Sequence, residues 1–441
     1  MQNVIDILQE RGFIEAMTSN NLREIASEPL KVYCGFDPTA ESLHVGNLVP
    51  IMGLAWFQRC GHTPVAIVGG ATGMIGDPSG KSQERNLLDE YALQKNVKGI
   101  QKNLESVLRY SSQSNEAIML NNFDWFKGFS LIDFLRDVGK YFRVGQMLAK
   151  DSVKTRMDSE DGLSFTEFSY QLLQGYDFLH LFDHHGVTLE LGGSDQWGNI
   201  IAGTDLVRKV RGKVVHGLTF PLLTRSDGKK FGKSEQGAVW LSAEMLSPYE
   251  FYQYFFRIPD ADVIKLMKML TFMEMEEIRD YEKSMMASDY KPNTAQRKLA
   301  EEVTRIVHGE EGLQIALRVT QGASPGSTTA LDSETLKNLA ADMPSFVVSL
   351  DQIANRKLVD LVNETTPERS KGDLRKMIKN GGVYLNNLRV EDENHVLTQS
   401  TLIDGHVMLI ALGKKNKMII RVSATGDTRK ILKEDEKKAP D

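Results

Sequence analysis

Short apolar segments alternate with helical patterns along the first half of the chain. Four segments rich in branched and aromatic residues are bounded by glycine or polar residues, which is typical of buried strands. Longer amphipathic stretches, such as residues 43–61, lie between them. This alternation predicts an α/β domain built on a parallel sheet. The predicted strands are LKVYCG (30–35), TPVAIVGG (63–70), VTLELGG (187–193) and LTFPLLT (218–224).

Three of these strands end in the same way. The segments YCGFD, VGGATGMIGD and LGGSDQ each run into glycine and then aspartate. Ligands of open α/β sheets bind at the carboxyl ends of the strands, and glycine removes side-chain bulk where a ligand approaches. The repeated pattern therefore predicts a nucleotide site at this edge, although glycines that merely end strands are the alternative for any single turn.

The length and the later segments predict several domains. A chain of 441 residues exceeds one ordinary core. The pattern becomes helical after the last strand, GASPGSTTA (322–330) has the composition of a linker, and a small α+β unit with a charged tail follows. The predicted division is an α/β domain at 1–236, a helical domain at 237–321, a linker at 322–350 and a small α+β domain with a charged tail at 351–441.

Composition narrows the function classes. Hydrophobic residues make up 41% of the chain and charged residues 25%, as in soluble globular proteins. We find no apolar run long enough to cross a membrane and no signal peptide, and two cysteines are too few for a disulfide framework. A cytoplasmic location is therefore expected. The net charge is −6, but residues 351–441 carry 17 Lys and Arg against 14 Asp and Glu, so RNA contact is expected there.

Two glycine- and lysine-rich loops resemble phosphate-binding P-loops without being P-loops. GKKFGKSEQG (228–237) and GDPSGKS (76–82) both contain Gly-Lys-Ser. A P-loop has four residues between its first glycine and the Gly-Lys pair, whereas Gly228 and Gly232 are separated by three. The loops therefore need another explanation.

The segment CGFDPTAESLHVGN (34–47) predicts a helix start that suits an anion. Ser42 is a good N-cap residue, and His44 and Asn47 then fall three apart in the first turns. Free backbone N–H groups and the helix dipole favour a phosphate there. Gly46 leaves that face flat for a base or ribose. The alternative is a capped helix with an incidental surface histidine.

A later segment, SFTEFSYQLLQGYDF (164–178), predicts a helix with one polar face. Ser164 and Glu167 form a capping box. Tyr170, Gln174 and Asp177 follow at helical spacing, so a phenol, an amide and a carboxylate share one side. Such a face needs partners if it is buried, and it is otherwise simply exposed to solvent.

The motifs together resemble those of a known family. The sequence HVGN (44–47) looks like the HIGH signature of class I aminoacyl-tRNA synthetases, and KFGKS (230–234) looks like their KMSKS signature. The segments YCGFDPTAESLHVG, GGATGMIGDPSGKS, SFTEFSYQLLQGYDF and GGSDQWGN closely resemble the bacterial tyrosyl-tRNA synthetases over essentially the whole chain. The resemblance implies a Rossmann-like catalytic domain, a helical anticodon-binding domain and a small RNA-binding domain similar to a ribosomal small-subunit protein.

The resemblance also implies site residues. The lysines would stabilise the departing pyrophosphate of Mg-ATP, and Tyr33 and Asp177 would bind the phenolic hydroxyl of the substrate. Asn47 departs from the family's histidine but can still donate a hydrogen bond. The implied catalytic residues are Thr39, His44, Lys81, Arg85, Lys230, Lys233 and Ser234; the tyrosine-binding residues are Tyr33, Asp77, Tyr170, Gln174, Asp177 and Gln196; the ATP-binding residues are Gly35, Asp37, Gly46, Asn47, Gly193, Asp195 and Lys233.

Partners follow from the same resemblance. Lys371, Arg375 and Lys379 repeat every four residues on a helix capped by Ser370 and would contact RNA phosphates, although a solvated charged helix is the alternative. The family implies tRNA(Tyr), L-tyrosine and ATP with Mg²⁺ as ligands, no protein metal site, and a homodimer through Phe165 and residues 134–142.

Three rival functions remain open at this stage. A tryptophanyl-tRNA synthetase would share the fold and both signatures, but Tyr33 and Asp177 count against it because an indole has no phenolic hydroxyl. A small nucleotidyltransferase of the same superfamily would be much shorter. The third rival is a synthetase-like RNA-binding protein without catalysis.

Overall fold

The computed structural model divides into two compact units, which are described separately. The first comprises Met1–Leu246 and Gln253–Gly309, and the second Ser247–Tyr252 and Glu310–Asp441. The predicted boundaries at 236, 321 and 350 stay predictions. The structure describes residues 2–79, 90–111, 114–158, 162–226, 228, 231–234, 237–322, 331–333, 336, 340, 344–367, 369–413, 416–423 and 432–433.

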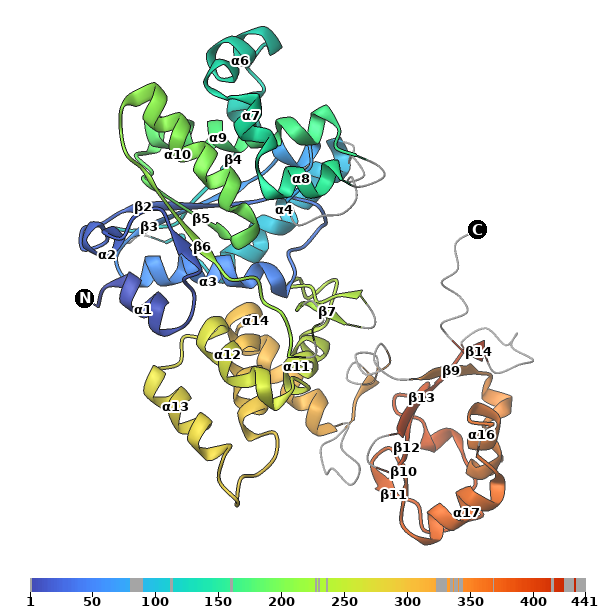
Figure 1. Ribbon diagram of the computed structural model, residues 1–441. Helices are drawn as coiled ribbons and strands as arrows, with labels where there is room; N and C mark the ends of the chain where they lie inside the picture. Colours follow the sequence, from blue (N-terminus) through green and yellow to red (C-terminus); the bar gives the residue numbers. More distant parts are fainter. Residues whose placement is uncertain are drawn as a thin grey trace. The chain divides into compact units, whose positions relative to one another are not determined.

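A six-stranded sheet forms the centre of the first unit (Figure 1). Five strands are parallel, and the short edge strand β1 pairs antiparallel with β6. The predicted α/β fold is confirmed, with β1 and β4 as additions. The order across the sheet is β1 (Ala16–Met17), β6 (His216–Phe220), β5 (Leu189–Gly193), β2 (Lys31–Phe36), β3 (Thr63–Val68) and β4 (Ile118–Asn121).

The strand order creates a crevice at the carboxyl ends of β2 and β5. From β2 the chain moves outward through β3 to β4, and it then returns to the other side of β2 for β5 and β6. Ligands of open α/β sheets bind where the strand order reverses in this way. The predicted site residues follow β2, β3 and β5, so the topology gathers them at one edge.

Helices cover both faces of this sheet (Figure 1). On one face, α3 packs so closely that a Cβ atom on Gly53 would lie 2.3 Å from the Phe220 ring. On the other, a Cβ atom on Gly203 of α10 would lie 3.0 Å from Phe178 of α9. The helices are α1 (Val4–Glu10), α2 (Leu22–Ile25), α3 (Val45–Arg59), α4 (Glu90–Glu105), α5 (Phe123–Phe126), α6 (Leu131–Asp137), α7 (Val144–Leu148), α8 (Asp151–Met157), α9 (Phe165–His185) and α10 (Trp197–Arg211), with 3₁₀ turns η1 (Thr72–Met74), η2 (Gly139–Tyr141) and η3 (Ser194–Gln196).

The chain after the sheet is helical, as predicted. A short hairpin, β7 (Lys233–Ser234) and β8 (Gly237–Ala238), precedes these helices. Ser247 and Glu250 form a capping box through two hydrogen bonds, at 3.0 and 3.2 Å. The helices are α11 (Pro248–Phe256), α12 (Asp260–Leu270), α13 (Met275–Ser284) and α14 (Thr294–Gly322), the last interrupted at Gly309, whose positive φ is not helical (φ 70°, ψ −178°).

The described residues from 344 onward form a small mixed sheet with helices α16 and α17, which confirms the predicted α+β unit. Strand β9 lies within the range predicted as a linker, yet it pairs with β13. The Ser370 hydroxyl caps α17 by accepting from the Asp373 amide at 3.2 Å, as expected. The elements are β9 (Ser345–Val348), η4 (Leu350–Gln352), α16 (Leu358–Thr365), α17 (Lys371–Lys379), β10 (Val383–Leu385), β11 (Leu388–Arg389), η5 (Gln399–Thr401), β12 (Val407–Leu412), β13 (Asn416–Val422) and β14 (Leu432–Lys433).

Across the described ranges, no helix combines the length and the apolar character that crossing a membrane requires.

Candidate active site

The carboxylate of Asp37 joins three elements at the edge of the sheet. Asp37 directly follows β2 and accepts a hydrogen bond from the Tyr170 hydroxyl of α9 at 2.9 Å. Its second oxygen accepts from the Thr72 hydroxyl of η1 at 2.7 Å. Burial, and then the Asp37 carboxylate, raise the pKa of Tyr170 well above its usual range, so this phenol stays a hydrogen-bond donor. Two predicted site residues are thus in direct contact.

A second carboxylate, Asp77, is held beside the end of β5. The Gln196 side chain donates to it at 2.7 Å, and the Ser79 backbone amide donates to its other oxygen at 3.0 Å. Asn199 in turn donates to the Gln196 carbonyl oxygen at 3.2 Å. The predicted pair of Asp77 and Gln196 therefore forms one buried network.

Asp177 lies deeper, on the inner face of α9. It is 5% exposed and accepts from the Trp125 indole at 2.8 Å and from the Asn122 amide at 3.2 Å. Burial raises its pKa well above the usual range of an aspartate, against the effect of these two donors. The buried Tyr33 hydroxyl lies in the same region. Burial raises its pKa well above the usual range, and the nearby Glu190 and Asp177 carboxyl groups raise the pKa further. Tyr33 and Asp177 are thus brought together, as predicted.

Three residues of this pocket were missed by the sequence analysis. Asn122 and Trp125 hold Asp177, and Glu190 of β5 accepts from the Gln174 amide at 2.9 Å. Only Glu190 left a visible signal in the sequence, because a carboxylate inside an apolar strand needs buried partners.

The N-cap of α3 is His44 and not Ser42, so that prediction was wrong. His44 Nδ1 accepts from the Gly46 amide at 3.0 Å, and the Asn47 side chain accepts from the His44 amide at 3.1 Å. Ser42 is buried and donates to the Asn103 side chain at 3.0 Å. A Cβ atom on Gly46 would lie 2.7 Å from the imidazole, so this glycine makes room for His44 itself.

The two predicted signatures meet in space. A Cβ atom on Gly232 would lie 3.1 Å from the backbone nitrogen of Gly46, and Gly232 has a positive φ of 87°. The Val239 amide donates to the Gly232 carbonyl at 2.9 Å, and the Val45 amide donates to the Val239 carbonyl at 2.8 Å. Gly232, in the described part of the KFGKS segment, is therefore held by its backbone against the first turn of α3.

Several predicted cations cannot be placed. Lys81, Arg85 and Lys230 lie outside the described residues, and for Lys233 and Ser234 only the backbone of β7 is described.

The remaining predicted residues are distributed over both units. Thr39 is exposed, and its amide donates to the Asp37 carbonyl at 2.9 Å. A Cβ atom on Gly193 would lie 2.6 Å from the Asp195 carboxylate, whereas one on Gly35 would meet nothing within 4 Å. In the second unit, the three predicted RNA-binding residues lie on α17. Arg375 is exposed, Lys371 pairs with Asp360 at 2.6 Å, and Lys379 pairs with Glu393 at 3.2 Å.

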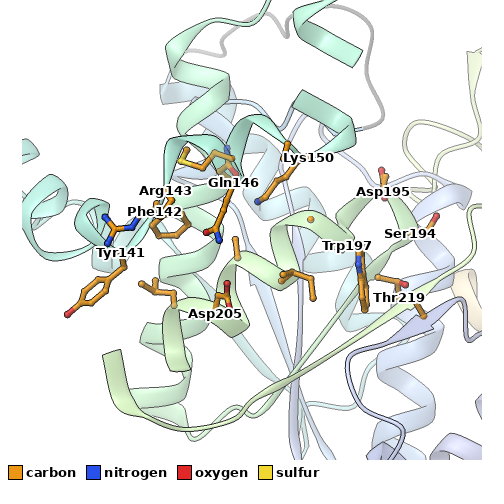
Figure 2. Close-up of a pocket in the computed structure, with 18 of the residues that line it drawn as sticks. Tyr141, Phe142, Arg143, Gln146, Lys150, Ser194, Asp195, Trp197, Asp205 and Thr219 are labelled. Carbon is orange, nitrogen blue, oxygen red and sulfur yellow. The ribbon is translucent and has the colours of Figure 1, made fainter. Parts of the chain in front are cut away.

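A cavity of about 780 Å³ lies on the same unit (Figure 2). It is lined by the segment around η2 and α7 and by α10, and it reaches Asp195 and Lys150. Burial lowers the pKa of the Lys150 ammonium to about 8, while Asp77 and then Glu190 oppose that shift. Both Asp77 and Glu190 belong to the networks described above, so Lys150, which lines the cavity, lies near these buried carboxyl groups.

Comparison with known proteins gives consistent matches. Residues 26–322 match the family "tRNA synthetases class I (W and Y)", and residues 335–420 match "Tyrosine--tRNA ligase SYY-like C-terminal domain". The chain is 64% identical over 422 residues to the tyrosine--tRNA ligase of Protochlamydia amoebophila, covering 96% of this chain and 99% of that one. It is 53% identical to the chloroplastic/mitochondrial enzyme of Arabidopsis thaliana, covering 96% and 84%.

A solved structure of a tyrosyl-tRNA synthetase is also similar to this chain. The C-terminally truncated mitochondrial tyrosyl-tRNA synthetase of Aspergillus nidulans matches with a TM-score of 0.65 and 33% identity. The match covers 72% of this chain and 92% of that one.

Proposed function

The chain belongs to the class I tRNA synthetases of the tryptophan and tyrosine group, and we propose that the pocket of Tyr33, Asp177 and Gln174 binds its amino-acid substrate. The activity is that of a tyrosine–tRNA ligase: tyrosyl-adenylate forms from tyrosine and ATP, pyrophosphate leaves, and tyrosine passes to the terminal adenosine of the tRNA. The assignment of individual residues to these steps is our proposal.

The observation that carries the assignment is the buried pair of Tyr33 and Asp177. A buried phenol beside a buried carboxyl group suits a ligand with a hydroxyl group at its tip. Phenylalanine would leave both groups buried without that partner, and an indole has no hydroxyl to offer. The ammonium group of the substrate would meet Asp77, Tyr170 and Gln174.

The neighbouring helix start would receive ATP. Anions favour helix N-termini, and His44 and Gly46 form the first turn of α3. Lys230, Lys233 and Ser234, together with Lys81 and Arg85, would face the charge that develops on the β- and γ-phosphates. Gly35, Asp37, Asn47, Gly193 and Asp195 would lie along the adenosine, and Thr39 near the γ-phosphate.

Magnesium would arrive on the ATP phosphates, because Mg²⁺ keeps several waters and is usually held by phosphates with few protein ligands. Among the residues that the structure describes, no group of three or more His, Cys, Asp and Glu side chains is arranged to hold a metal ion.

Amino-acid-dependent exchange between ATP and pyrophosphate tests this function. We expect exchange with tyrosine and at least about a hundredfold less with phenylalanine or tryptophan, because each buried polar group left unpaired costs about 1–3 kcal/mol. Exchange driven by tryptophan would contradict the pocket assignment. Binding of tRNA without any exchange would favour the non-catalytic alternative.

We propose a homodimer, which an exposed apolar surface supports. Leu131 and Ile132 of α6 are 71% and 69% exposed, Val144 of α7 is 62% exposed and Phe165 at the start of α9 is 76% exposed. Large exposed apolar side chains gathered in neighbouring segments mark interaction surfaces. Phe165 is itself one of the predicted interface residues, and Leu131 and Ile132 directly precede the predicted interface range 134–142 in the sequence.

Changing Ile132 and Phe165 to aspartate is expected to raise the dimer dissociation constant at least tenfold, because two charges would have to be desolvated in the interface. Sedimentation velocity over a concentration series measures this. Val214→Asp, at an exposed apolar residue elsewhere in the unit, is the matched control. A dimer of unchanged affinity in the double variant would contradict the proposed surface.

The tRNA and the compartment complete the proposal. Lys371, Arg375 and Lys379 on α17 would contact RNA phosphates, which give affinity without sequence choice.

A cytoplasmic location is supported by the free thiols of Cys34 and Cys60, because a reducing compartment keeps cysteines unpaired.

A further inference from the structure

Glu190 is a neighbour of two residues proposed to bind the amino acid, Tyr33 and Gln174, although the function described above gives it no task. It lies in β5, where its Cα is paired with that of Tyr33 in the adjacent parallel strand β2. Paired residues of neighbouring strands project from the same face of a sheet. The Glu190 side chain is 2% exposed and lies beneath α9 and α10, so its carboxylate needs partners inside the protein.

One carboxylate oxygen fixes the side chain of Gln174. The Gln174 amide nitrogen donates to Glu190 Oε1 at 2.9 Å. Since the amide group is planar, holding its nitrogen directs its oxygen to the opposite side. That oxygen, Gln174 Oε1, is buried and accepts no hydrogen bond from the described residues. A buried acceptor without a donor is costly, and an ammonium group would satisfy it.

The same residue also lies beside Tyr33, because the two are paired in adjacent strands and project from the same face of the sheet. The Tyr33 hydroxyl interacts with Glu190 strongly enough to lower the pKa of that carboxyl, while Glu190 helps raise the pKa of Tyr33. Glu190 therefore accepts a hydrogen bond from the residue proposed for the substrate ammonium and lies near the residue proposed for the phenolic hydroxyl.

We propose that Glu190 is the positioning residue of the tyrosine pocket, orienting Gln174 toward the substrate ammonium and fixing the charge beside Tyr33. This inference rests on the proposed assignment of the pocket. The negative charge of Glu190 also favours the ammonium group directly, because Coulomb attraction is strong in a buried site.

The charge of Glu190 depends on pH near neutrality. Burial raises its pKa to about 7, against the opposing effects of Gln174, Tyr33 and the Lys150 ammonium. The titratable groups that face it are Tyr33 and Cys34 of β2, Asp177 of α9 and Lys150 before α8. A carboxyl group is charged above its pKa, so the affinity for tyrosine should fall as the pH is lowered from 8 to 6.

Two substitutions separate position from charge. Glu190→Gln keeps an oxygen that can accept from Gln174 but removes the charge, and Glu190→Ala removes both. Glu28→Gln, at an exposed residue of the same unit, is the matched control for the loss of one negative charge. Each variant is assayed for the KM of tyrosine and of ATP in pyrophosphate exchange, for tyrosine affinity by calorimetry between pH 6 and 8, and for thermal unfolding.

We expect Glu190→Ala to raise the tyrosine KM at least tenfold while the ATP KM stays within about twofold. Glu190→Gln should raise the tyrosine KM less at pH 8, and its tyrosine affinity should no longer change between pH 6 and 8. If the alanine variant does not fold, the pH profile of the glutamine variant decides alone, and it also separates Glu190 from Lys150, which titrates in the same range.

The proposal would be overturned by an unchanged tyrosine affinity in folded variants, by equal increases in both KM values, or by a pH profile that survives in Glu190→Gln. These outcomes differ from a failure of the proposed function, which would show as absence of tyrosine-dependent exchange in the unmodified protein.

Discussion

Replacing Asp177 by asparagine is expected to lower kcat/KM for tyrosine about a hundredfold while that for phenylalanine changes less than tenfold. Asp177 accepts hydrogen bonds from Trp125 and Asn122, and a carboxylate still has lone pairs for the substrate hydroxyl. An amide presents a donor in place of one acceptor oxygen. Each unsatisfied buried group costs about 1–3 kcal/mol, and about 2.7 kcal/mol corresponds to a hundredfold. Phenylalanine makes no such hydrogen bond, so its kcat/KM should change little in the variant.

Pyrophosphate exchange at varied tyrosine and phenylalanine concentrations measures this change in preference. Asp183→Asn provides a control on the same helix, because Asp183 is exposed and pairs with Arg211 at 2.7 Å. A parallel loss for both amino acids in Asp177→Asn would indicate damage to the fold and would remove Asp177 from the phenol-binding role.

Replacing Lys233 by alanine is expected to lower kcat for adenylate formation at least about a hundredfold with tyrosine affinity unchanged. A positive group aimed at charge that develops only in the transition state acts on the rate, and removing one such electrostatic contact costs about 10²–10³ in kcat. The backbone of Lys233 follows Gly232, which lies against the first turn of α3.

Single-turnover formation of the adenylate, together with calorimetric binding of tyrosine, separates the two effects. Lys213→Ala removes an exposed lysine of the same unit as a comparison. Weaker tyrosine binding with a normal chemical step would argue that the loop supports the amino-acid pocket and not the phosphates.

The sheet was largely predictable because its central strands are apolar runs ending in glycine. The two strands that the sequence analysis missed are short. Strand β1 has two residues and β4 has four, so neither contains enough residues to show a periodic pattern. Both are edge strands, and their pairing depends on neighbours far away in the sequence.

The start of α3 shows why local rules failed at one position. Serine is a preferred N-cap, so Ser42 was the natural choice. In the structure, the Asn103 side chain accepts from the Ser42 hydroxyl and from the Leu43 amide. These contacts come from a residue about 60 positions later, and they leave His44 to cap the helix.

The pocket was predicted in part for a similar reason. Tyr170, Gln174 and Asp177 share a helix face, and helical spacing alone brings them together. Their partners come from other elements: Glu190 from β5, and Asn122 with Trp125 from the segment after β4. No local spacing relates these partners to α9, so only the folded sheet reveals them.

The backbone hydrogen bonds that join Val45, Val239 and Gly232 also bear on how the protein is made. The segments they connect are about 190 residues apart. At about 5–20 residues per second, a ribosome needs about 10–40 seconds to extend from the first to the second. Throughout that interval the start of α3 lacks its partner, so the catalytic centre is completed only after the strands of its own sheet have been synthesised.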